Sequence, residues 1–109
     1  MTTREERAAQ NEAVSREINE GLEQAHADEP PDRYLRMYCE CGRSACESMI
    51  AITASEYERV RSDPVRFLIL GEHLISDIER VVEETDRFVV IAKREGTPAR
   101  VAREEDPRS

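Results

Sequence analysis

All three cysteines of the chain lie within one short segment, Cys39-Glu40-Cys41-Gly42-Arg43-Ser44-Ala45-Cys46. Thiolate sulfur is a preferred ligand of zinc, and structural zinc sites fill all four tetrahedral positions with cysteine and histidine side chains. The segment therefore predicts a metal site in which Cys39, Cys41 and Cys46 supply three of the four ligands.

The fourth ligand has to come from another part of the chain. We favour His73, which follows a hydrophobic run, because a ligand held on the core side of a fold is better fixed than one on a loop. The competing histidine, His26, stands beside acidic residues at the expected end of a helix. Glu40, Glu47 or a water molecule are further alternatives, and water would leave a position open for catalysis. We expect one structural zinc ion.

The spacing of the cysteines suits a single ion. In a strand, residues two apart point to the same side, so Cys39 and Cys41 can both face the metal. Gly42 allows a tight reversal, and Arg43 would offset the negative charge of three thiolates. Two other interpretations remain: three reduced thiols without a metal, or a thiol–disulfide switch that pairs Cys46 with Cys39 or Cys41.

Length and charge narrow the class of protein. A chain of 109 residues predicts one small domain, which a metal ion would help to stabilise. The net charge of -8 argues against nucleic-acid binding and against docking to anionic lipid. We find neither a secretory signal nor the roughly 20 consecutive apolar residues that a membrane helix needs. We expect a cytoplasmic protein without membrane contact, where clustered cysteines stay reduced.

The N-terminal part predicts an amphipathic helix over residues 4–25, which ends before Pro30-Pro31 because proline cannot continue a helix. This helix carries one narrow apolar stripe at helical spacing, formed by Val14, Ile18, Leu22 and Ala25. The stripe predicts packing against the domain or against a second copy of the chain. The surplus of acidic residues over 1–29 is a candidate docking surface for a basic partner.

The remaining pattern predicts an α+β fold with a small antiparallel sheet. Strands over 33–39 and 48–52 would form a zinc-knuckle hairpin with the cysteines at its tip. Thr53 and Glu56 match a capping box that opens one short helix, ending near residue 62. A buried strand over 66–70 and a turn at 71–73 follow.

Residues 75–94 fit both helical and strand spacing, and we favour a hairpin of 78–84 with 87–93 because Phe88 to Ala92 is a typical strand. The chain from Gly96 onward shows no apolar face, which predicts a disordered tail. We accordingly divide the chain into an acidic helix over 1–29, a zinc-binding α+β domain over 30–94 and a disordered tail over 95–109.

Several motifs resemble those of small uncharacterised bacterial proteins, mostly actinobacterial, with a zinc-ribbon-like character and a CxC-x4-C…H pattern. The likeness covers roughly residues 10–93 and is carried by Asn11 to Glu20, Cys39 to Cys46, Tyr57 to Arg61, Gly71 to His73 and Ile78 to Val82. The resemblance implies a cytoplasmic zinc-ribbon-like protein and groups Cys39, Cys41, Cys46 and His73 as one ligand set. It implies no activity.

These features rank the classes of function. We expect no enzyme, because the chain lacks an HExxH motif, a deaminase pattern and a glycine-rich phosphate loop. We favour a zinc-stabilised module for protein interaction or regulation, whose N-terminal helix contacts a protein partner or a second copy. One alternative is a redox sensor that releases zinc on oxidation. Another is a weak nucleic-acid-binding zinc ribbon, in which Tyr34, Arg36 and Tyr38 share a strand face suited to base stacking.

Overall fold

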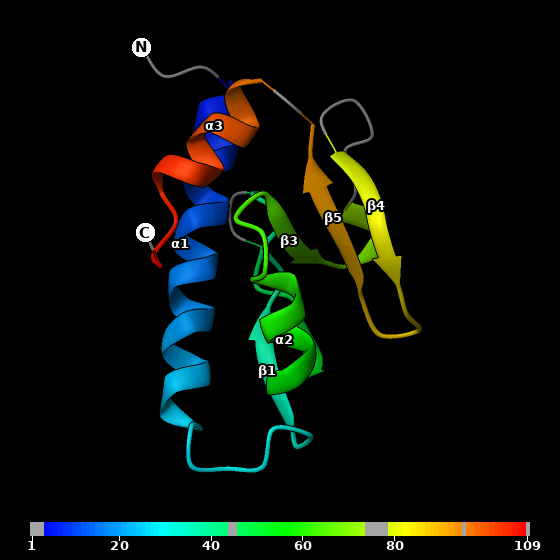
Figure 1. Ribbon diagram of the computed structural model, residues 1–109. Helices are drawn as coiled ribbons and strands as arrows, with labels where there is room; N and C mark the ends of the chain where they lie inside the picture. Colours follow the sequence, from blue (N-terminus) through cyan, green and yellow to red (C-terminus); the bar gives the residue numbers. More distant parts are fainter. Residues whose placement is uncertain (1–3, 44–45, 74–78, 95, 109) are drawn as a thin grey trace.

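The computed structural model describes residues 4–43, 46–73, 79–94 and 96–108 (Figure 1). It confirms an α+β fold. The two antiparallel sheets have the strand orders β1-β2 and β3-β5-β4. In chain order the elements are α1 (Arg4–Ala25), β1 (Tyr34–Tyr38), β2 (Met49–Thr53), α2 (Ala54–Val60), β3 (Arg66–Ile69), the 3-10 turn η1 (Gly71–His73), β4 (Glu79–Glu84), β5 (Val89–Lys93) and α3 (Thr97–Glu104).

The predicted cysteine hairpin is confirmed. β1 and β2 pair antiparallel, with Leu35 opposite Ile52 and Met37 opposite Ile50. These four side chains are buried, as the alternating pattern requires of the face that packs on the core. The hairpin continues past β1, because the Cys39 N–H donates to the Ser48 carbonyl at 2.9 Å.

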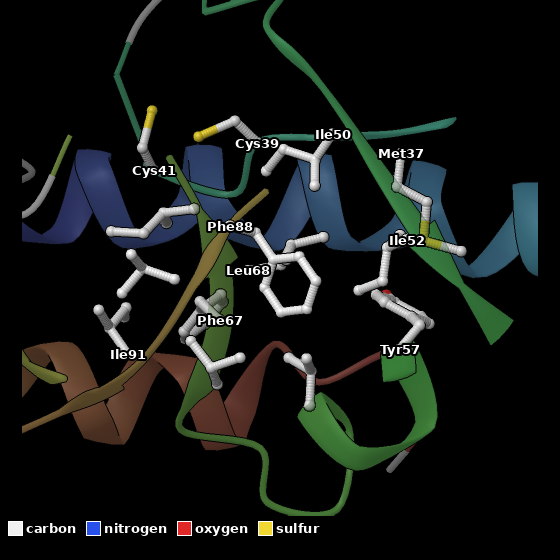
Figure 2. Packing of buried hydrophobic residues seen from close by; sticks show 14 of the residues in the cluster. Met37, Cys39, Cys41, Ile50, Ile52, Tyr57, Phe67, Leu68, Phe88 and Ile91 are labelled. Carbon is white, nitrogen blue, oxygen red and sulfur yellow. The ribbon is translucent and has the colours of Figure 1, made fainter. Parts of the chain in front are cut away.

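Strand β3 joins the hairpin to the second sheet. The Glu40 N–H donates to the Leu68 carbonyl at 2.7 Å, which places the end of the hairpin beside β3. Phe67, Leu68 and Ile69 are all buried, so the expectation of a strand covered on both faces is confirmed. Figure 2 shows the resulting core, in which Phe67 and Leu68 lie among the buried side chains of the other strands and α2.

The short helix α2 begins with the predicted capping box. Thr53 Oγ1 accepts the Glu56 N–H at 3.1 Å, and Glu56 Oε1 accepts the Thr53 N–H at 2.9 Å. Tyr57 and Val60, the two residues expected on one face of this helix, are both buried.

The ambiguous region forms the hairpin that we favoured. β4 and β5 pair antiparallel, with an irregularity in the register between Val81 and Glu83. Residues 75–78 of this region lie outside the described residues. None of the helices in the described parts of the chain is long and apolar enough to cross a membrane.

Helix α1 has the predicted bounds, but the expectation that it packs on the domain through its apolar stripe is wrong. Val14 and Ile18 are 57% and 46% exposed. The buried face of α1 is polar and consists of Glu12, Arg16, Asn19 and Glu20. The physical reason is that α1 lies against polar partners, namely strand backbone and the charged side chains of other elements, and these need hydrogen bonds rather than apolar contact.

The expectation of a disordered tail from Gly96 is also wrong, because the chain forms helix α3 there. Pro98 stands in the first turn, where a missing N–H costs nothing. Ala99 and Ala102 are buried, and α3 packs beside α1 (Figure 1). Beyond α3, Arg108 Nε donates to Glu20 Oε1 at 2.7 Å. This hydrogen bond attaches the segment after α3 to α1.

Candidate metal centre

The four predicted ligands converge in space. The ligand atoms of Cys39, Cys41, Cys46 and His73 all lie within 4.8 Å of one another. His73 Nδ1 lies 3.3 Å from Cys39 Sγ and 3.8 Å from Cys46 Sγ. Zinc bonds of about 2.3 Å to sulfur and about 2.0–2.1 Å to nitrogen place these two atoms about 3.6 Å apart in a tetrahedron. The two distances bracket this value, so His73 Nδ1 lies at a separation from these two sulfurs that suits a shared zinc ion.

Local backbone structure explains how the cysteines meet. Cys39 is held by its hydrogen bond to Ser48 at the end of the hairpin. Gly42 then reverses the chain with φ +77, a left-handed conformation that glycine adopts without a steric penalty. The Cys46 N–H donates to the Arg43 carbonyl at 3.3 Å, which closes the loop and returns the third sulfur.

His73 reaches the site through strand β3. The pairing of Glu40 with Leu68 brings β3 alongside the hairpin, and the chain then turns into η1, where the His73 N–H donates to the Leu70 carbonyl at 2.9 Å. This single turn presents the imidazole to the sulfurs. We predicted that the fold would bring His73, just after a buried strand, to the cysteines. The structure shows this arrangement.

The competing ligands lie elsewhere. His26 Nδ1 is 2.9 Å from Glu29 Oε2, just beyond the end of α1. The Glu40 carboxylate is fully buried and accepts hydrogen bonds from Asn19 and Leu68. Among the described residues, the group of side chains close enough to hold an ion contains Cys39, Cys41, Cys46 and His73, and Glu47 is not part of it.

The surroundings affect the protonation of the thiols. Burial raises the pKa of Cys39, and this effect exceeds that of the Leu70 N–H, which donates to Cys39 Sγ at 3.4 Å and favours the thiolate. Burial also raises the pKa of Cys41. Burial acts in the same direction on Cys46, but hydrogen bonds from Ser48 and the other thiols lower its pKa overall. A metal ion binding here must displace protons, so its affinity rises with pH.

The site lies at the edge of the core. Cys39 and Cys41 are buried, whereas Cys46 and His73 are partly exposed. All three cysteines are free thiols. Three sulfurs and one imidazole nitrogen are donors that zinc prefers, and together they fill a tetrahedral shell.

Sequence reasoning missed two residues of α1 that form hydrogen bonds to the backbone of the cysteine segment. Asn19 Nδ2 donates to the Tyr38 carbonyl at 2.9 Å, and Asn11 Nδ2 donates to the Gly42 carbonyl at 3.2 Å. Asparagine is a weak helix former because its amide competes for backbone hydrogen bonds. Two asparagines inside a segment that otherwise consists mostly of good helix formers were therefore the available signal. They indicated that this face of the helix makes hydrogen bonds to the backbone of another segment.

The chain was compared with protein-family models, with curated proteins and with solved structures, and none of the three comparisons found a match. The resemblance to small actinobacterial zinc-ribbon-like proteins therefore stays a prediction. What groups Cys39, Cys41, Cys46 and His73 is the convergence of their ligand atoms in the fold.

Proposed function

We propose that the chain is a non-catalytic domain that binds one structural zinc ion through Cys39, Cys41, Cys46 and His73. The observation that supports this most directly is the approach of all four ligand atoms to within 4.8 Å of one another. Soft thiolates select zinc over magnesium, calcium or manganese. A shell closed by four protein ligands leaves no position for a substrate or for an activated water, which is the pattern of structural sites.

The ion would join parts of the chain that are distant in sequence. It links the tip of the β1–β2 hairpin to η1, which follows β3 of the other sheet. A crosslink of this kind stabilises a small domain because binding to a site that exists only in the folded state adds to the free energy of unfolding.

Native mass spectrometry of protein prepared without chelators tests the site. We expect one zinc ion per chain, lost in Cys46→Ser and in His73→Ala. The matched control is His26→Ala, because His26 is paired with Glu29 away from the cysteines and its removal leaves the metal in place. Wild-type protein that carries no metal, or His73→Ala protein that binds zinc as tightly as the wild type, would refute the proposed ligand set.

We also propose that the outer face of α1 contacts a protein partner or a second copy of the chain. The support is the exposure of Val14 and Ile18 on one side of this helix. The acidic docking surface that we expected is smaller than the sequence indicated, because Glu12 and Glu20 are buried and paired with Lys93 and with Arg61.

The test of this surface is the double variant V14S/I18S, with the exposed change Gln10→Ala on the same helix as its control. We expect sedimentation velocity to show association of the wild type that weakens only in the double variant, or a binding partner that only the double variant fails to retain. A wild type that stays monomeric and whose partners are unaffected by V14S/I18S contradicts the proposal.

The partial exposure of Cys46 supports a second candidate, a redox-responsive site. Peroxide would convert the Cys46 thiolate to a sulfenic acid with release of water or hydroxide. A neighbouring thiol, Cys39 or Cys41, would then displace the sulfenic oxygen as water to form a disulfide, and zinc would leave. The measurement is zinc release, followed with a chromophoric chelator during peroxide titration. Zinc that stays bound until the protein unfolds indicates a purely structural ion.

A further inference from the structure

The polar face of α1 lies directly on the segment that carries the metal ligands. We propose that this face is part of the metal site, so that docking of α1 and binding of the ion are coupled and loss of the ion releases the helix. The inference rests on the proposed zinc site. The residues that couple the helix to the site are Asn11 and Asn19 on α1 and Glu40 in the loop. They position the metal ligands and do not touch the ion.

Asn19 substitutes for a neighbouring strand at the edge of β1. Its Nδ2 donates to the Tyr38 carbonyl at 2.9 Å, and its Oδ1 accepts the Tyr38 N–H at 2.8 Å. One side-chain amide thus satisfies both backbone groups of a strand residue that would otherwise be unpaired. Because Tyr38 immediately precedes Cys39, Asn19 fixes the backbone one residue away from the first metal ligand.

Glu40 lies between two ligands and points the other way. Since alternate residues in an extended segment face opposite sides, turning Cys39 and Cys41 toward the ion turns Glu40 toward the interior. The carboxylate is fully buried there, and it accepts the Leu68 N–H at 3.0 Å and Asn19 Nδ2 at 2.9 Å. The position of this carboxylate therefore connects α1 and β3 with the orientation of both cysteines.

At Gly42 the loop backbone touches α1 itself. Asn11 Nδ2 donates to the Gly42 carbonyl at 3.2 Å. A Cβ atom at Gly42 would lie 2.6 Å from the Ala8 carbonyl oxygen and 2.8 Å from Glu12 Cγ. Helix and loop are thus in contact along the run from Tyr38 to Gly42.

These contacts make α1 sensitive to the shape of the loop. The side chains that α1 buries among its described residues are Glu12, Arg16, Asn19 and Glu20, all of them polar. Asn19 binds the segment before Cys39, and Glu12 lies against Gly42. Arg16 and Glu20 bind Pro64 and Arg61 instead, so the loop controls one part of this face. Hydrogen bonds require short distances and good angles, whereas apolar burial tolerates small shifts. An ion that holds the loop in place therefore favours the docked helix. By linkage, a docked helix favours the ion by the same factor.

Coupling of this kind means that the domain presents different surfaces with and without the ion. In the structure α1 covers the edge of β1 and keeps Glu12 and Glu20 buried, and we assign this arrangement to the domain with the ion bound. Without the ion, the released helix would expose these carboxylates together with the unpaired backbone of β1, which is a template for added strands. The metal content of the domain would in this way decide what it presents to a partner.

Hydrogen exchange of the wild-type chain, zinc-loaded and after removal of zinc by a chelator, tests the release directly. We expect the amides of α1 to lose protection in the metal-free protein while those of β3 and β5 keep theirs. Unchanged protection of α1 would overturn the inference. Equal loss across α1, β3 and β5 would also overturn it, because the ion would then stabilise the whole fold without selecting the helix.

Zinc affinity, measured by competition with a chelator, tests the coupling in the other direction. We expect Asn19→Ala to bind zinc about 10- to 100-fold more weakly, the usual effect of removing a group that orients a metal ligand, and Asn11→Ala to show a smaller loss. Gln24→Ala is the matched control, because it removes an exposed amide from the same helix. The visible spectrum of the cobalt-substituted variants should match that of the wild type, since the four ligands are unchanged.

Wild-type zinc affinity in both asparagine variants would refute the coupling and leave the zinc site itself intact. Failure of the zinc site is a separate result, in which the wild type binds no metal. If Asn19→Ala does not fold, Asn11→Ala still decides the question, because Asn11 is exposed and, within the described part of the chain, its side chain donates one hydrogen bond, to the Gly42 carbonyl.

Discussion

Replacing Glu12 by glutamine should remove a loss of stability that the wild-type domain undergoes as the pH rises. Lys93 Nζ lies 2.7 Å from Glu12 Oε2 and also contacts the Glu79 carboxylate, and all three side chains are buried. Two carboxylates therefore share one ammonium group. Burial raises the pKa of Glu12 from 4.5 to about 7; Lys93 and Arg16 oppose this rise, and the like charge of Glu79 adds to it.

The size of the effect follows from the two pKa values. A carboxyl group whose pKa is higher in the folded than in the unfolded chain favours folding while it is protonated, below pH 4.5, and this contribution is lost as the pH rises through about 7. At about 1.4 kcal/mol per pKa unit, the loss amounts to about 3 kcal/mol. Glutamine at position 12 does not titrate, so the variant avoids the loss.

The assay is urea denaturation of zinc-saturated wild type and Glu12→Gln across this pH range. Taking the difference between the two proteins removes the pH dependence of the cysteines and of Glu23, whose pKa burial also raises to about 7. We expect the variant to gain about 3 kcal/mol on the wild type between acidic and mildly alkaline pH. The control is Glu17→Gln, which removes an exposed carboxylate from the same helix. A pH-independent difference between Glu12→Gln and wild type would refute the reasoning.

Three further changes test other parts of the fold. Gly42→Ala should lower the stability of the zinc-loaded domain by about 2 kcal/mol in thermal unfolding, since left-handed backbone is costly with a side chain and the new Cβ would collide with α1; an unchanged midpoint contradicts this. Thr53→Ala should cost about 1 kcal/mol in urea denaturation through loss of the α2 cap, and the exposed Ser55→Ala much less. Deletion of residues 97–109 should cost about 3 kcal/mol, because buried Val101 and two alanines are lost; a truncated chain as stable as the full one would mean that α3 adds nothing.

The parts of the fold that the sequence predicted well are those in which local pattern and environment agree. Leu35 and Met37 alternate with polar residues because β1 has one face on the core and one toward solvent. The capping box at Thr53 and Glu56 is satisfied within one turn of helix, so no distant contact could alter it. The four candidate ligands also came from the sequence, since cysteines cluster for chemical reasons and few histidines compete.

The tail was mispredicted because its contacts are small and distant. Ala99 and Ala102 are buried in a helix, α3, that packs on α1. An apolar face made of two alanines is too small to be recognised from the sequence without knowledge of this partner. The Arg108 side chain pairs with Glu20, which is far away in the sequence. A run of charged residues with few large apolar side chains satisfies the compositional rule for disorder, and the rule contains no information about partners of this kind.

The error on α1 has a different origin, because a hydrophobic stripe predicts a buried face only where the neighbouring surface is apolar. The surface beside α1 includes the edge of β1, which presents backbone N–H and C=O groups that must be paired. A helix that covers such an edge has to supply hydrogen-bonding side chains, and Asn19 does so for Tyr38. The apolar stripe is then left on the outer side, where Val14 and Ile18 are exposed. Burial of the polar face and exposure of the apolar one thus follow from what α1 packs against: the open edge of the hairpin, which Asn19 covers, and charged side chains such as Lys93 and Arg61.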